Sequence, residues 1–132
     1  MLEEARVGHL GLLDDDDRPR VLPVTYALWE GSLWSAVDAK PKRVEPGEVA
    51  RVRFLRRRPE AALTVDRYSE DWSSLAWVQV LGSVEIVAAA GAPEALDALA
   101  RRYEPYRSSD PPGPLLRLVP RRCLHWRAKD SG

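Results

Sequence analysis

The chain has 132 residues, of which 45% are hydrophobic, and this is enough for one ordinary domain with one core. Its 20 basic and 20 acidic residues cancel, so the composition favours neither a disordered chain nor a general binder of polyanions. The single Cys123 excludes an intramolecular disulfide and fits a reducing compartment. Without a signal-peptide pattern or an apolar stretch of membrane-spanning length, we expect a cytoplasmic protein with one domain over residues 1–132.

The first third of the chain predicts strands joined by tight turns. Residues 5–13 are apolar and predict a first strand, and the acidic run at residues 14–19 predicts a hairpin turn more than a cation site. Residues 20–29 are rich in β-branched and aromatic side chains and predict a second strand, with Pro23 at a sheet edge or a bulge. A Glu-Gly hairpin signal then leads into a returning strand over residues 32–37.

Residues 35–58 concentrate positive charge on a chain that is neutral overall. Residues 48–58 predict a helix whose Val49, Val52 and Leu55 recur at helical spacing and face the core. The basic residues of this stretch are Lys40, Lys42, Arg43, Arg51, Arg53, Arg56, Arg57 and Arg58.

A local positive concentration suggests a small anionic ligand, and we expect Lys40, Lys42 and Arg43 to hold a phosphate. Pro41 limits the freedom of the loop that carries them. The arginines at positions 56–58 have a structural explanation at a helix C-terminus and are not counted as ligands. The alternative is that the whole charge run is a solvated surface.

Residues 61–68 and 75–88 predict two further strands. Along the second, every even position from 76 to 86 is apolar and suits the core of a barrel, whereas the odd positions include Trp77 and Gln79. That second face suits a subunit interface or the wall of a ligand cleft. Gly82 suggests a bulge.

The last third predicts a second helix and the closing strands. Residues 91–103 predict the helix, residues 107–114 a loop, and residues 115–119 and 123–127 two strand segments broken at Pro120. Strands joined by hairpins, with two inserted helices, indicate an all-β barrel with helical decoration.

Three motifs in order, DAKPKR, DRYSEDW and WVQVLGSVEIV, resemble the pyridoxamine 5'-phosphate oxidase-like flavin and deazaflavin oxidoreductases. Within that group the chain is most similar to small actinobacterial-type proteins that bind coenzyme F420, and the resemblance covers residues 5–126. It implies a mainly β, FMN-binding split β-barrel with two or three short helices. It also implies a homodimer whose cofactor cleft lies at the subunit interface.

The resemblance also implies a cofactor site. Basic side chains would hold the phosphate, backbone groups of the preceding strand would lie alongside, and two Trp and a Gln would line the ring cleft. The residues are Ser35, Ala36, Val37, Lys40, Pro41, Lys42, Arg43, Trp72, Trp77 and Gln79. The chain departs from many relatives at Phe54-Leu55, where they carry an Asn, so a polar contact from that Asn is absent.

The expected function is an F420-dependent oxidoreductase that transfers hydride between the deazaflavin and an unidentified small organic substrate. The surplus charge of Arg51 or Arg53 would suit the polyglutamate tail of F420. The alternatives are an FMN-binding oxidase or reductase of the same fold, and a binding protein without turnover. No catalytic residue is nominated, no metal-ligand spacing is present, and we expect neither a nucleic acid nor a membrane as a partner.

Overall fold

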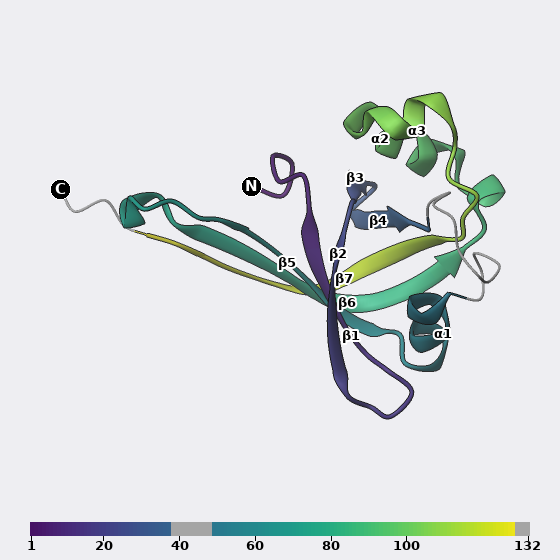
Figure 1. Ribbon diagram of the computed structural model, residues 1–132, viewed down its shortest axis with the longest axis horizontal. Coiled ribbons are helices and arrows are strands. Elements are labelled where there is room, and N and C mark those ends of the chain that lie inside the picture. The colour runs from purple at the N-terminus through teal and green to yellow at the C-terminus, as the bar shows by residue number, and fades with distance from the viewer. Residues whose placement is uncertain (38–48, 129–132) are drawn as a thin grey trace.

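The computed structural model describes residues 1–37 and 49–128, and they form one seven-stranded antiparallel sheet. The strand order is β2-β1-β5-β6-β7-β4-β3. The strands are β1 (Gly8–Leu13), β2 (Pro19–Val24), β3 (Ala27–Trp29), β4 (Ser32–Ala36), β5 (Glu60–Arg67), β6 (Ala76–Val87) and β7 (Leu115–Arg127). The helices are α1 (Ala50–Arg57), α2 (Pro93–Arg102) and α3 (Glu104–Ser108). Figure 1 shows α2 and α3 together at one end of the sheet and α1 beside its lower part.

The sheet encloses a core built from the inward positions of its strands. Leu10 and Leu63 from β1 and β5 pack there with Val80 of β6, and α1 covers the core with Val52 and Leu55. The prediction for the helix face is therefore confirmed, although Phe54 is buried as well. A second cluster lies under α2 and α3, against β3 and β4.

The apolar even face of β6 is also confirmed, and so is the bulge at Gly82. The register between β6 and β7 shifts between Leu81 and Gly82. A Cβ atom at Gly82 would lie 2.1 Å from the carbonyl oxygen of Val119, so only glycine fits this close approach.

Three boundaries differ from the prediction. The break at Pro120 is wrong: β7 runs without interruption, because Pro120, which has no N–H, lies opposite Gly82 at the register shift. The expected strand over residues 20–29 is divided into β2 and β3 by two residues, 25 and 26. The expected loop at residues 107–114 begins inside α3. Pro23 does lie on an edge strand, as predicted.

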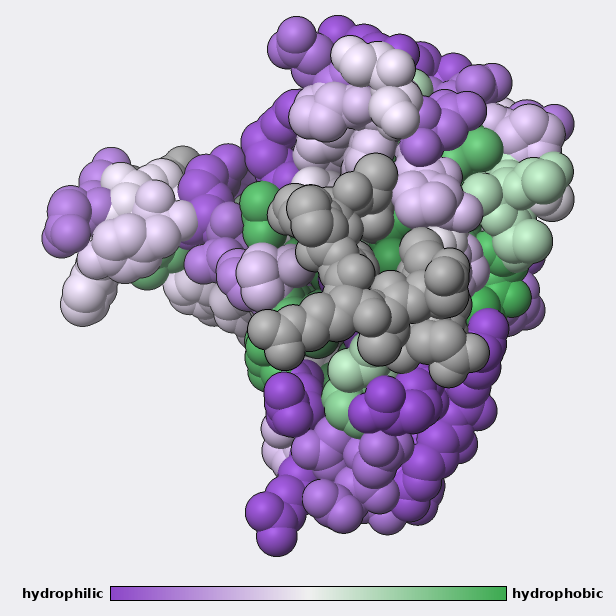
Figure 2. All heavy atoms as spheres, turned by 45° about the vertical axis from the view of Figure 1, so that its right-hand side comes forward, coloured by the Kyte–Doolittle hydropathy of each residue, from purple (hydrophilic) through white to green (hydrophobic). Residues whose placement is uncertain are grey.

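The acidic turn between β1 and β2 is paired with α1. Arg53 Nε lies 3.2 Å from Asp15 Oδ2, and Arg57 Nη1 lies 2.8 Å from Asp17 Oδ1. Arg58 reaches the same Asp17 carboxylate at 3.3 Å. The hydrogen bond from Arg57 lowers the pKa of the Asp17 carboxyl and raises that of Arg57. The hydrophilic surface at the bottom of Figure 2 belongs to this turn and to α1.

The strands β5, β6 and β7 continue beyond the barrel as an arm, which projects to the left in Figure 1. A short 3₁₀ turn, Trp72–Ser74, forms its tip. In the part of the chain that the structure describes, no helix is both long and apolar enough to cross a membrane.

Candidate functional site

A cavity of about 240 Å³ lies where the two edges of the curled sheet approach each other. Its walls come from the end of β2, from β4, from the start of β1 and from α1. The lining residues are Val7, Pro23, Val24, Thr25, Ser35, Ala36 and Arg51. We call this the split cavity, because β2 and β4 belong to opposite ends of the strand order.

Among the described residues that line the split cavity, Arg51 is the cation. It lies in the first turn of α1, and the neighbouring Val52 is fully buried and fixes the orientation of the helix. The Nε atom of Arg51 is buried and has no hydrogen-bond partner among residues 1–37 and 49–128. A guanidinium stays charged at every ordinary pH, and a buried N–H without an acceptor is costly. Arg51 also lines the cavity, and a guanidinium carries several N–H donors, so the residues present fit a phosphate or a carboxylate.

The other arginines of α1 are differently placed. Arg53, Arg57 and Arg58 are exposed and contact the acidic turn, and Arg53 also lies over the Phe54 ring at 5.1 Å. Of Arg51 and Arg53, the two arginines expected to supply surplus charge, only Arg51 lines the split cavity.

Ser35 and Ala36, both predicted as site residues, lie in β4 and line the split cavity. Val37 is placed differently. Its side chain is fully buried in the core, and its N–H donates to the carbonyl oxygen of Pro114 at 3.2 Å. The Val37 amide is therefore already engaged within the protein. The predicted residues Lys40, Pro41, Lys42 and Arg43 lie outside the described residues.

Trp72, Trp77 and Gln79 lie on the arm, and none of them lines the split cavity. Trp72 is 69% exposed at the tip. Trp77 is 37% exposed and stands directly opposite Trp126 of β7. Gln79 donates from Nε2 to Thr64 Oγ1 at 3.1 Å. Within one chain, the predicted ring-binding residues and the predicted phosphate-binding strand are thus on separate surfaces.

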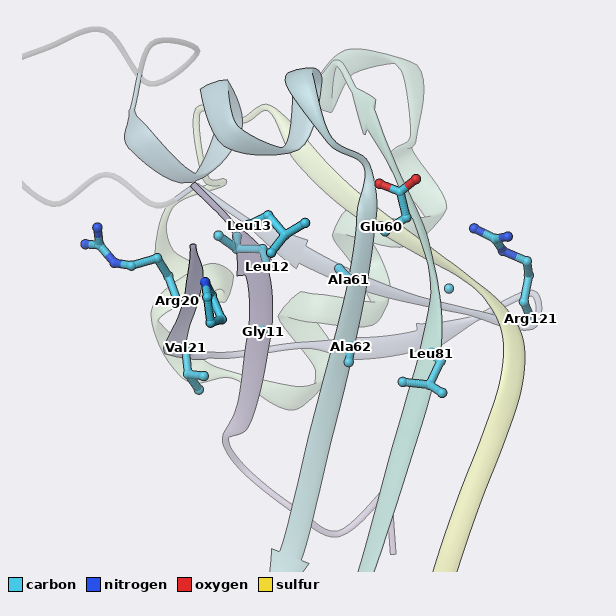
Figure 3. A pocket seen from close by; sticks show the side chains of 12 residues that line it. Gly11, Leu12, Leu13, Arg20, Val21, Glu60, Ala61, Ala62, Leu81 and Arg121 are labelled. Atoms are coloured by element: carbon cyan, nitrogen blue, oxygen red, sulfur yellow. The ribbon is translucent and has the colours of Figure 1, made fainter. Parts of the chain in front are cut away.

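A second hollow, of about 510 Å³, lies on the outer face of β1, β2, β5, β6 and β7. Small side chains form its floor, with Gly11, Ala61 and Ala62 on adjacent strands. Figure 3 shows Arg20 and Arg121 at opposite ends of this outer groove. The groove is mostly apolar and open.

Sequence reasoning missed Thr25 and Val7 as cavity residues, because each looked like an ordinary strand residue. Arg51 carried no signal that separates it from Arg53, since each directly precedes a buried position of the helix, Val52 and Phe54. No group of three His, Cys, Asp or Glu side chains that could hold a metal ion occurs in residues 1–37 and 49–128.

The curled antiparallel sheet, open along one side where a cationic cavity lies, defines a split β-barrel protein with a site suited to an anionic ligand. A family model described as pyridoxamine 5'-phosphate oxidase matches residues 1–121, so the chain belongs to that family. No curated protein matches the sequence.

Solved structures share the fold at low identity. An F420 reductase is 21% identical with a TM-score of 0.68, and the match covers 93% of this chain and 92% of that one. A FAD-binding protein from Mesorhizobium loti is 19% identical with a TM-score of 0.65, over 94% and 85% of the two chains. A heme-binding protein from Mycobacterium smegmatis is 23% identical with a TM-score of 0.69, over 96% of this chain and 50% of that chain. At these identities the likeness supports the fold alone.

Proposed function

We propose that this protein is an oxidoreductase that binds coenzyme F420 and transfers hydride between the deazaflavin and a small organic substrate. The observation that carries the proposal is the guanidinium group of Arg51, which lines the split cavity and has no ion-pair partner among the described residues. It calls for an anionic oxygen, and F420 carries a phosphate. The resemblance of the sequence to F420-binding relatives and the fold shared with an F420 reductase support the same cofactor.

In this proposal the chain's own residues bind and orient the cofactor. Arg51 donates to the phosphate, and Ser35 and Ala36 form the wall of strand β4 against which the phosphate end lies. Lys40, Lys42 and Arg43, which lie outside the described residues, would add positive charge at the phosphate in this proposal. The deazaflavin supplies the hydride chemistry when bound, and the protein fixes its ring relative to the substrate.

The second part of the proposal is a homodimer whose cofactor cleft lies between the subunits. Trp77 and Trp126 form an exposed aromatic pair on the outer face of the sheet, and Val21 on that face is 70% exposed. Val21 also lines the outer groove, and exposed large apolar side chains of this kind are typical of an interface. A second copy would cover these side chains and could bring arm residues to the split cavity, which one chain alone does not do.

The paired arginines of α1 argue for a small anionic ligand and against a nucleic acid. Arg53 and Arg57 face carboxylates of the acidic turn, so their charges are locally neutralised. Binding of F420 should therefore depend only weakly on salt, whereas contacts to many phosphates would give a steep dependence.

An FMN-binding oxidase or reductase is the alternative, because FMN also joins a tricyclic ring to a phosphate. The second alternative is a carrier protein that binds the cofactor without turnover. A multiple-turnover assay separates them from the proposal: reduced F420 is mixed with catalytic amounts of protein and a panel of quinones, enones and nitroaromatic acceptors. The proposal is supported if each protein molecule oxidises many equivalents of reduced F420 and if the Arg51→Met variant loses this activity. Tight binding with at most one equivalent oxidised across the panel would contradict an enzymatic role.

The dimer has a separate test in light scattering at micromolar concentration. The proposal expects twice the chain mass of 14.8 kDa for the native protein. Trp77→Arg should give the single-chain mass, and the matched control Leu28→Arg, at a comparably exposed position on β3, should not. A native mass equal to one chain would refute the two-subunit cleft.

A further inference from the structure

The split cavity has one wall that is not held by the sheet. Residues 25 and 26 lie between the end of β2 and the start of β3, so they have no strand pairing of their own. Thr25 nevertheless lines the cavity, and Tyr26 is fully buried next to it. Something other than the sheet must satisfy the backbone groups of this bend and fix its shape.

Two tyrosines from the helical end of the molecule contact the bend, Tyr103 through the backbone of Tyr26 and Tyr106 through the side chain of Thr25. The N–H of Tyr26 donates to the hydroxyl oxygen of Tyr103 at 3.1 Å. The same hydroxyl lies 3.0 Å from the carbonyl oxygen of Tyr26 and 2.9 Å from that of Arg6, either of which can accept its single hydrogen. Tyr103 thus takes the place of a neighbouring strand at Tyr26, and it also holds Arg6, whose neighbour Val7 lines the cavity.

Tyr106 holds the side chain of the bend. Its hydroxyl lies 3.0 Å from Thr25 Oγ1. The rings of Tyr103 and Tyr106 meet edge to face with centroids 5.9 Å apart, and both residues are buried at the junction of α2 and α3. The pair is therefore rigid, and neither ring lines the cavity.

We propose that Tyr103 and Tyr106 are positioning residues that fix the bend and orient the Thr25 hydroxyl, which donates a hydrogen bond to a carbonyl oxygen or ring nitrogen of the bound cofactor. Either hydroxyl can donate in the contact between Tyr106 and Thr25, and the proposal assigns the donor role to Tyr106, which leaves the hydrogen of Thr25 for the ligand. The contact to the cofactor rests on the proposed function, whereas the fixing of the bend does not.

Thr25 then recognises the ring system while Arg51 recognises the phosphate, because both line one cavity. The two ends of the ligand can be tested separately. Inorganic phosphate probes the Arg51 end alone, followed by the NMR shift of the Arg51 Nε–H signal. Coenzyme F420 and FMN, titrated by fluorescence, probe both ends.

Thr25→Val and Tyr106→Phe each remove one hydroxyl and keep the shape of the side chain. Each should weaken cofactor binding by roughly 3- to 10-fold, the effect of one neutral hydrogen bond, and leave phosphate binding unchanged. The double variant should be no weaker than Thr25→Val, because Tyr106 acts through Thr25. Thr25→Ser, which restores the hydroxyl, should bind as the native protein does.

Native affinity in Tyr106→Phe, or additive losses in the double variant, would overturn the role of Tyr106 as a positioning residue, and native affinity in Thr25→Val would overturn the role of Thr25. An equal loss of phosphate binding would overturn it too, because it would indicate general damage to the cavity.

Hydrogen exchange without any ligand tests the bend and stays informative if the native protein binds neither cofactor. Tyr103→Phe should raise the exchange rate of the Tyr26 amide by roughly 10-fold or more, because that N–H loses its acceptor. Tyr68→Phe is the matched control, since Tyr68 is exposed on the arm. Unchanged exchange in Tyr103→Phe would show that the bend does not depend on the tyrosine pair.

Discussion

Replacing Arg51 by Met separates a ligand-binding arginine from a structural one. The buried Nε of Arg51 has no hydrogen-bond partner in the part of the chain that the structure describes, and an unsatisfied buried donor costs about 1–3 kcal/mol. Met keeps most of the aliphatic packing and removes that donor. We therefore expect the free energy of unfolding of the ligand-free protein to stay the same or to rise by about 1 kcal/mol, which corresponds to about 3–5 °C in Tm.

Ligand binding should change in the opposite direction. A charge-assisted hydrogen bond contributes about 1.5–3 kcal/mol, so Arg51→Met should weaken F420 binding by roughly 10- to 150-fold. Urea unfolding followed by circular dichroism gives the stability, and a fluorescence titration gives the affinity. Arg53→Met is the matched control: it lies on the same helix but faces Asp15, and it should leave the affinity unchanged.

The reasoning would be refuted if Arg51→Met lost more than about 1 kcal/mol of stability and kept the native affinity. That result would mean that Arg51 supports the fold and that the split cavity binds no anion through it.

Two further variants test contacts that stabilise the fold. Asp17 has a lowered pKa in the folded protein, mainly through its hydrogen bond from Arg57, so it stabilises the fold above the ordinary value of 3.8 and loses that contribution as the pH falls below it. Asp17→Asn should therefore flatten the loss of stability on acidification in urea unfolding from about pH 5 down to about pH 2, and an unchanged slope would contradict the ion pair. Gly82→Ala should cost about 2–3 kcal/mol in urea unfolding, because its Cβ would strike the Val119 carbonyl, whereas Gly91→Ala, with open space around it, should be neutral. Equal stability of the two alanine variants would argue against the close approach at the bulge.

Local patterns predicted most of the fold. The alternation along β6 predicted the inward face, because side chains of a strand alternate with a two-residue period. The glycine within it predicted the bulge, because a residue without a side chain allows a close approach of other backbone. The failure at Pro120 is instructive: proline was taken to end the strand, but the bulge at Gly82 lies opposite and accommodates the missing N–H. A pairing between residues far apart in the chain decided the outcome, and a local pattern does not contain it.

The sequence predicted the residues of the candidate site less well than it predicted the fold. Ser35 and Ala36 were predicted and do line the split cavity, but Thr25 was not, because its role depends on a break in pairing and on Tyr106 from a distant helix. Arg51 and Arg53 look alike in sequence. The acidic turn separates them in the structure, since it pairs with Arg53 and leaves Arg51 to the cavity.

The most direct test of the central claim is a side-by-side titration of the purified protein with coenzyme F420 and with FMN, followed by fluorescence at moderate salt. The account predicts saturable binding of F420 that is tighter than that of FMN and is lost in Arg51→Met. A preference for FMN would move the protein to the flavin branch of the family. Binding of neither cofactor would contradict the proposed function and leave only the fold and the family.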